Sequence, residues 1–209
     1  ISSMRYPADV AYDVAGQRLF VADTNNNRVL MFNLDAGVDA GMAASNVLGQ
    51  PWFDAGAQGV SATEMRFPRG VAFDDSSRLL YVSDTENSRI LVFETTVVAN
   101  GQAALAVLGQ AVFDAGVSGT SASTLSYPQR LSLDTDGGRL FVADSSNSRV
   151  MVFDVATVTN GEAAVHSVGH ADSADAASPI FDSYCSNGPG RNRLNYAMES
   201  ATGLAGDHA

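Results

Sequence analysis

One hairpin pattern occurs three times in this chain and constrains its fold more than any other feature. It first spans Leu19 to Phe32 (LFVADTNNNRVLMF) and returns at Leu79 to Phe93 and at Leu140 to Phe153. Each copy contains an apolar run, a polar break of the form Asp-[Thr/Ser]-x-Asn-x-Arg and a second apolar run, which is typical of a β-hairpin. The breaks stand 61 and 60 residues apart. The chain is therefore predicted to repeat one all-β unit.

Short motifs on both sides repeat with the hairpin and enlarge the unit. A Pro-led segment precedes each copy, first as YPADVAYD at Tyr6 to Asp13, and an apolar segment follows, first as NVLGQ at Asn46 to Gln50. Each unit is thus predicted to hold four short strands. The first strands carry Val10, Val71 and Leu131, and the buried second strands carry Val21, Val82 and Val142. The units span residues 4–50, 66–110 and 127–169, a partial unit spans 193–209, and insertions span 51–65, 111–126 and 170–192.

The composition fits a folded globular chain. Hydrophobic residues make up 45% of its 209 residues, which is ordinary for such chains. The longest apolar run has six residues, far fewer than the roughly 20 that span a bilayer. We expect no membrane span. The chain starts at Ile1 in the middle of a repeat, so the absence of a visible leader sequence leaves its cellular location open.

The charge opposes nucleic acid as a partner. The formal net charge is −11, and all twelve basic residues are arginine, most of them at fixed repeat positions rather than in a basic stripe. The single cysteine, Cys185, excludes an internal disulfide framework. Acidity, the absence of lysine and many small polar residues favour an exported bacterial protein, so we expect an extracellular or cell-surface location.

The polar breaks are interpreted as structural turns rather than as ligand contacts. Asp and Asn side chains bond to local backbone in turns, and an Arg can bridge back to the Asp or to a neighbouring unit. The turn residues concerned are Asp23, Asn26, Arg28, Asp84, Asn87, Arg89, Asp144, Asn147 and Arg149.

A search for catalytic and metal-binding groups assigns none. His166 and His170 lie four apart without a Cys or Glu partner at ligand spacing, and His208 is isolated. Cys185 has no nearby base that would mark a nucleophile. The segment Asp134 to Gly138 starts like a calcium loop, but the other repeats lack its acidic spacing, and we expect a plain hairpin turn. No cofactor is expected.

These motifs resemble NHL repeats, the β-propeller blades with a Pro-led strand, a Val-[Ala/Ser]-Asp strand end and an Asn-x-Arg-[Val/Ile] strand start. The recurring VLGQ and Phe-Asp segments are similar to the long-repeat version in bacterial surface and secreted proteins. The resemblance implies an all-β propeller of four-stranded blades, with three full blades and the start of a fourth. Because this fold hosts lyases, lactonase-like hydrolases and plain binding modules, it does not fix the function.

The insertions are expected to share one face of the propeller with the polar turns, since strand direction alternates within a blade. Loops on a rigid scaffold are where binding usually occurs. Phe53, Phe113 and Phe181 repeat and are expected to fasten each insertion to its blade. Trp52 does not repeat and is the better candidate for a contact surface.

Three blades cannot close a ring, because propellers need at least about four, and an open end leaves strand edges and an apolar flank exposed. We therefore expect a protein partner, either further copies of the chain or the rest of a longer chain, with Leu194, Tyr196 and Met198 in contact. The expected function is a non-enzymatic interaction or structural module, in one form a filament subunit. A propeller-type lyase or lactonase-like hydrolase is the alternative.

Overall fold

The computed structural model describes residues 3–169, and almost all of its regular structure is strand. Blade 1 consists of β1 (Pro7–Asp13), β2 (Arg18–Asp23), β3 (Arg28–Asn33) and β4 (Asn46–Leu48). Blade 2 consists of β5 (Pro68–Asp74), β6 (Leu79–Asp84), β7 (Arg89–Glu94) and β8 (Ala106–Leu108). Blade 3 consists of β9 (Pro128–Asp134), β10 (Arg139–Asp144), β11 (Arg149–Asp154) and β12 (His166–Val168). The partial fourth repeat lies outside the described residues.

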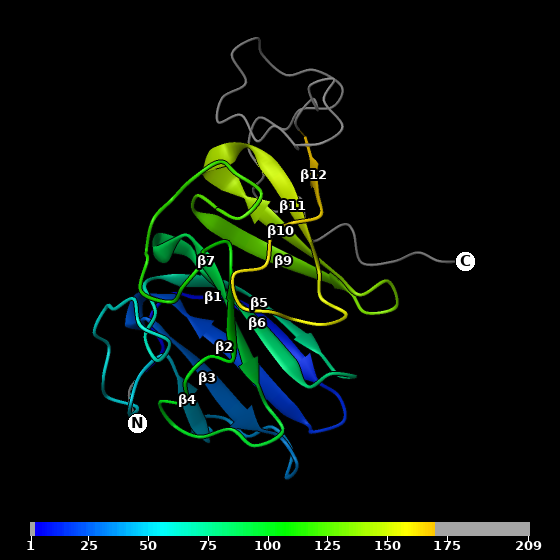
Figure 1. Cartoon of the computed structure of the whole chain (residues 1–209). Coiled ribbons are helices and arrows are strands. Elements are labelled where there is room, and N and C mark those ends of the chain that lie inside the picture. Colours follow the sequence, from blue (N-terminus) through cyan, green and yellow to red (C-terminus); the bar gives the residue numbers. More distant parts are fainter. Residues whose placement is uncertain (1–2, 170–209) are drawn as a thin grey trace.

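Each blade is an antiparallel sheet whose strands pair in chain order. Figure 1 shows blade 1 at the bottom, blade 2 in the middle and blade 3 at the top, packed in sequence. The first strands β1, β5 and β9 are neighbours, so each blade starts at the shared inner side and runs outward. The predicted fold class, an all-β propeller of four-stranded blades, is confirmed for three blades.

The middle strands of each blade are apolar on both faces because a blade between two others has no solvent side. In blade 2, Leu80, Val82 and Leu91 face the core shared with blade 1, whereas Tyr81 and Ile90 face the core shared with blade 3. Successive side chains of a strand point to opposite faces. One strand therefore supplies two interfaces.

The three apolar residues predicted on the inner strands have different surroundings. Val71 and Leu131 are buried, with 5% and 7% of their surfaces exposed, but Val10 is 58% exposed. All three occupy equivalent places on the first strands. The difference arises because Val71 and Leu131 each face a preceding blade, and Val10 faces none among the described residues.

Close approach of the inner strands requires a glycine in blade 2. A Cβ atom added at Gly70 would lie 2.1 Å from the carbonyl oxygen of Gln129 on β9. Such a contact is far inside van der Waals distance and forces the two strands apart. Gly70 thus sets the spacing between blades 2 and 3.

We predict that Gly70→Ala lowers the free energy of unfolding by about 1 to 3 kcal/mol, because overpacking displaces the inner strands. Urea unfolding followed by circular dichroism measures the change. The matched control is Gly56→Ala, whose Cβ would lie an ordinary 3.6 Å from the carbonyl oxygen of Asn26 and which should change stability by less than about 0.5 kcal/mol. Equal effects of the two substitutions would contradict the steric explanation.

Candidate functional site

A buried ion pair organises each turn between the second and third strands. In blade 2, the Asp84 carboxylate accepts hydrogen bonds from Nε of Arg89 at 2.6 Å, Nδ2 of Asn87 at 2.8 Å and the backbone N of Arg66 at 2.6 Å. Asp84 and Arg89 have no exposed side-chain surface. The same contacts recur in blade 1 (Asp23, Asn26, Arg28 and Arg5 N) and in blade 3 (Asp144, Asn147, Arg149 and Ser126 N).

Two features of each turn determine where its arginine points. A short 3-10 turn, Thr85–Asn87 in blade 2, is followed by Ser88 in the left-handed region at φ 55°. The chain thereby reverses and brings Arg89 opposite Asp84 in the register of β6 and β7. The spacing Asp-x-x-Asn-x-Arg in the sequence reflects this geometry.

The arginines also bind the insertions. Arg89 donates to the carbonyl oxygens of Val60, Ser61 and Glu64, which belong to the insertion that precedes its blade, and to that of Phe113 in the next insertion. In blade 3, Arg149 donates in the same way to Thr120, Ser121 and Thr124. The insertions therefore lie against the polar turns, on one side of the blades, and their backbone is fixed there.

Two opposing effects act on the pKa values of the buried carboxylates. Burial raises the pKa of Asp84 and of Asp144, because the charged form loses water, while the partner arginines and hydrogen-bond donors act in the opposite direction. Burial likewise lowers the pKa of Arg149 against the pull of Asp144. Asp84 and Asp144 accept hydrogen bonds from their own turns and from the segment just before the first strand of the same blade.

Blade 1 has the same turn but an incomplete set of partners. Arg28 is buried and donates through Nη1 to the carbonyl oxygen of Phe53, yet its Nη2 has no hydrogen-bond partner. The equivalent Nη2 atoms of Arg89 and Arg149 bond to carbonyls of the preceding insertion. Asn26 donates to the carbonyl of Ser3 at 3.1 Å, where Asn87 donates to that of Gly59.

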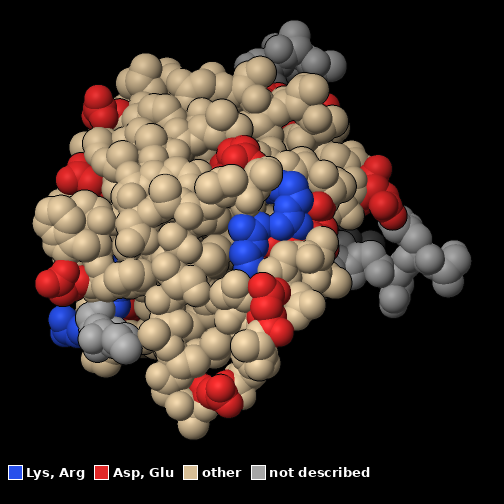
Figure 2. Space-filling view, turned by 90° about the horizontal axis from the view of Figure 1, so that it is seen from below, with Lys and Arg blue, Asp and Glu red and all other residues tan. Residues whose placement is uncertain are grey.

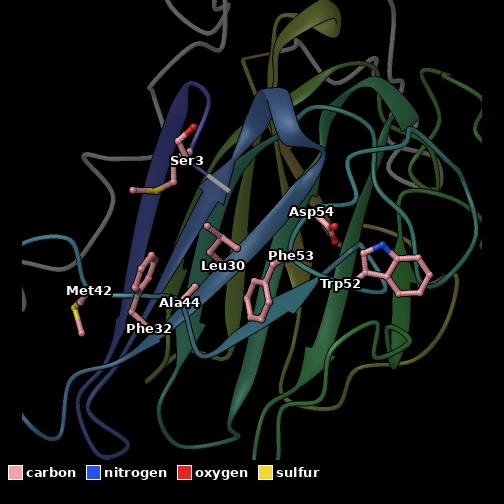
Figure 3. A pocket seen from close by; sticks show the side chains of 9 residues that line it. Ser3, Leu30, Phe32, Met42, Ala44, Trp52, Phe53 and Asp54 are labelled. Carbon is pink, nitrogen blue, oxygen red and sulfur yellow. The ribbon is translucent and has the colours of Figure 1, made fainter. Parts of the chain in front are cut away.

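The open end of blade 1 is an apolar hollow of about 530 Å³. Figure 3 shows Leu30 and Phe53 near its centre, with Phe32 and Met42 towards one margin and Trp52 at the other. Trp52 is 60% exposed. Figure 2, which views the molecule from the blade 1 end, shows mostly uncharged atoms, with acidic groups mainly towards the rim and a group of basic atoms to the right of the middle. This end combines an exposed aromatic, a hollow and a buried unpaired donor.

A second ionic cluster joins blades 1 and 2 at their opposite ends, near the turns between first and second strands. Asp13 accepts from Nε of Arg18 at 2.6 Å and from Nη1 of Arg78, in blade 2, at 2.7 Å. Arg18 also donates to the carbonyl of Thr95 in blade 2. Burial would raise the pKa of Asp13, but the bonds from Arg78, the Gly16 backbone and Arg18 lower it overall to about 2.

Several sequence-predicted residues contribute no site. His166 is exposed on β12, and Asp134 accepts from the backbone N of Gly137 in a hairpin turn. Within residues 3–169, no group of three His, Cys, Asp or Glu side chains is placed to hold a metal ion. The predicted contact residues Leu194, Tyr196 and Met198 lie outside the described residues, together with Phe181, Cys185, His170 and His208.

Phe53 and Phe113 pack against the apolar layers of blades 1 and 2. This is where the sequence interpretation placed them, as fasteners of the insertions. No helical turn within residues 3–169 has the length and apolar character that a membrane crossing requires.

Sequence reasoning missed two residues, Met4 at this end and Arg78 in the ionic cluster. Met4 is 45% exposed, whereas its equivalents Met65 and Leu125 are fully buried; the signal was an apolar residue three positions before each proline. Arg78 stands at nearly the same repeat spacing as Arg18 and Arg139, but the strand registers pair Arg18 with Asp13 and Leu79 with Asp74. Arg78 therefore lies one residue out of step, which lets it reach the neighbouring blade.

Comparisons with known proteins agree with this architecture. The NHL repeat model matches residues 4–32, 65–93 and 125–153. The chain is 31% identical over 147 residues to NHL repeat-containing protein 2 of Gallus gallus and 28% identical over 148 residues to that of Homo sapiens. Each alignment covers 66% of this chain and 19% of the relative, so the chain spans about a fifth of the length of these curated relatives.

A solved structure, Kuenenia stuttgartiensis hydrazine synthase, has a similar fold, with a TM-score of 0.53 at 14% identity. The superposition covers 79% of this chain and 36% of that one. At this identity the likeness concerns the fold alone.

We predict that Arg89→Met lowers the free energy of unfolding by about 3 to 5 kcal/mol, because it leaves the buried Asp84 charge unpaired. It also frees the carbonyls of the 51–65 insertion, so limited proteolysis should cleave there before global unfolding. The control is Arg66→Met, which removes a partly exposed pair with Glu86 and should cost at most about 1 kcal/mol. Equal losses would argue against the ion pair as the anchor.

We predict that Asp13→Asn removes part of the acid sensitivity of the fold. Because the folded-state pKa of Asp13, about 2, lies below the ordinary aspartate value of 3.8, the carboxylate stabilises the fold above about pH 4, and this contribution disappears as the pH falls towards 2. Urea unfolding at pH 6 and pH 2 should show a pH-dependent loss smaller by roughly 1 to 2 kcal/mol in the variant. Asp39→Asn, in an exposed loop, should retain the wild-type loss.

Proposed function

Because the chain belongs to the NHL-repeat family, we propose that it is a non-enzymatic interaction and structural module of a surface or extracellular protein. In this role it supplies propeller blades that associate with other protein, either further copies of the chain or further blades of a longer chain. The acidic, lysine-free composition supports the surface location, as in the long-repeat proteins that the sequence resembles.

The observation that carries the proposal is the apolar hollow at the open end of blade 1. Its lining residues Leu30 and Phe32 occupy the places that Leu91 and Phe93 hold in the core between blades 1 and 2. An apolar surface that is buried elsewhere in the same fold marks an interaction site when it is left at the end of the stack. Protein is the partner that such a sheet face fits.

The turn clusters support the structural part of the proposal. Their carboxylates and guanidinium groups are buried and bond to backbone of the turns and insertions. A rigid loop face with Trp52 exposed beside the hollow provides preformed contacts, which reduces the conformational entropy lost on binding. An open filament is one form that such association can take, because contacts between unlike surfaces form open assemblies unless they close a ring.

The alternative, a propeller-type lyase or lactonase-like hydrolase, has no specific observation in its favour within residues 3–169. Metal analysis of the purified 209-residue chain tests it independently. Stoichiometric zinc or calcium that survives dialysis would favour the enzyme over the interaction module.

We predict that the wild-type chain self-associates at micromolar concentration, because the open apolar end is removed from water on contact. Multi-angle light scattering after size exclusion should give a mass at least twice the chain mass of 21.8 kDa. A soluble, stable and strictly monomeric chain at all concentrations would overturn the self-association that this function includes.

A further inference from the structure

Resting on the proposed function, we infer that the open end of blade 1 binds blade 3 of a second copy of this chain, and that two copies close a six-bladed ring. The two ends of the described structure carry complementary surfaces. Each end holds a buried hydrogen-bond donor without a partner, and the internal interfaces show what those donors require.

The internal interfaces provide the template. We call the face of a blade that packs against the next blade in the chain its forward face, and the face that packs against the preceding blade its receiving face. Blade 1 meets blade 2, and blade 2 meets blade 3, through the same repeat positions. Leu48 and Leu108 lie on the forward faces of blades 1 and 2, and Val71 and Leu131 lie on the receiving faces of blades 2 and 3. All four are nearly fully buried. A third interface of the same kind would join the forward face of blade 3 to the receiving face of blade 1.

The receiving face of blade 1 is vacant at the positions that this template fills. Val10 is 58% exposed, against 5% for Val71 and 7% for Leu131. Met4 is 45% exposed, whereas Met65 is fully buried against Gly49 of the preceding blade. Pro7 is exposed, although the equivalent prolines of blades 2 and 3 are buried.

The forward face of blade 3 carries the matching features. Val168 is 53% exposed, against 1% for Leu48 and 0% for Leu108. Ser145 is 2% exposed, and its Oγ has no hydrogen-bond partner. The equivalent hydroxyls of Thr24 and Thr85 donate at 2.7 Å to the carbonyls of Pro68 and Pro128 in the following blade.

The hydroxyl of Ser145 therefore lacks a proline carbonyl at the start of a following blade. Pro7 of a second copy supplies that acceptor, since it is the only one of the three equivalent prolines in residues 3–169 that is exposed. A buried hydroxyl without a partner is unfavourable because it has lost its hydrogen bonds to water, and docking removes this cost.

Arg28 provides the corresponding signal at blade 1. Its buried Nη2 has no partner, whereas Arg89 and Arg149 each use Nη2 to bind two carbonyl oxygens of the segment that leads in from the preceding blade. In the proposed ring, this donor faces the forward end of blade 3 of the second copy. The two orphaned donors thus point to one interface from opposite sides.

Some of the hydrogen bonds at the margin of the internal interfaces have counterparts at the proposed interface. Arg18 donates to the carbonyl of Thr95 across the interface of blades 1 and 2. Arg139, which is half exposed, holds the same place on blade 3, and the carbonyl of Leu34 holds the place of Thr95. One bond is absent, because Ala40 replaces the asparagine that accepts from Val47 or Val107 elsewhere. The new interface is therefore weaker than the internal ones.

The number of copies follows from the blade count. Propellers close with about four to eight blades. The described residues of one copy supply three blades, those of two copies supply six and those of three copies supply nine, so two is the only whole number of copies inside the range. The partner is a single second copy, and each copy contributes both ends.

The experiment uses charged substitutions at positions that are exposed in the single chain. Val10→Glu alters the receiving face and Val168→Glu alters the forward face, while Val97→Glu, on a blade 2 loop and 76% exposed, is the matched control. Met4→Glu is a second variant of the receiving face. Circular dichroism confirms folding, and sedimentation velocity measures the mass of each chain at equal concentration.

The wild type and Val97→Glu should sediment as dimers, and Val10→Glu, Met4→Glu and Val168→Glu should each weaken association roughly 100-fold or more, because a buried unpaired charge is unfavourable. An equimolar mixture of Val10→Glu and Val168→Glu should associate more strongly than either variant alone. In such a pair, one interface joins the two unaltered surfaces, and the altered surfaces meet at the other.

Other outcomes distinguish the inference from the proposed function. Assemblies that are unaffected by the variants, that respond to only one end, or that grow beyond two copies overturn the ring and leave self-association standing. A mixture that associates no more strongly than either variant alone also overturns the head-to-tail arrangement. A strictly monomeric wild type overturns both, and then the blades that cover these ends belong to another protein or to a longer chain.

Discussion

The buried pair of arginine and aspartate in each turn is the interaction on which the loop face depends. A guanidinium group has five N–H donors and must bond through them when it is buried. The aspartate takes one donor, and the remaining donors of Arg89 draw the carbonyls of the 51–65 insertion together. A single side chain thereby links a hairpin to a loop some 25 residues earlier. The insertions are ordered because the arginine requires acceptors, not because they have strands of their own.

The same requirement explains why the ends of the stack differ from its middle. Every blade is built to be covered on both faces, since its central strands are apolar throughout. Blade 2 meets this condition and has no orphaned arginine donor in its turn. Blade 1 has the same sequence pattern but no preceding insertion among the described residues, so Arg28 keeps a buried N–H without an acceptor. Each repeat therefore needs the same acceptors for its arginine, but only a blade with a preceding insertion has them.

Much of the fold is predictable from the sequence because its signals are local and repeated three times. The alternation in Leu19 to Phe32 and the turn after Asp23 suffice to predict a hairpin, and repetition predicts the propeller. The cluster of Asp13 with Arg78 was not predictable, because Arg78 lies one residue out of step with its apparent equivalents and its partner is in another blade. The exposure of Met4 was not predictable for a related reason. It depends on whether a preceding blade covers the residue, and the residue type does not show this.

A ring made from two copies also accounts for an interface that is individually weaker than those inside the chain. Ala40 removes one hydrogen bond that Asn100 and Asn160 provide at the internal interfaces. In a closed pair, however, the first contact brings the second pair of surfaces together within one particle. The second contact then forms at the high effective concentration of an intramolecular event. Two modest interfaces, closed in a ring, hold the particle far more firmly than either interface holds an open dimer, so strong individual contacts are not required.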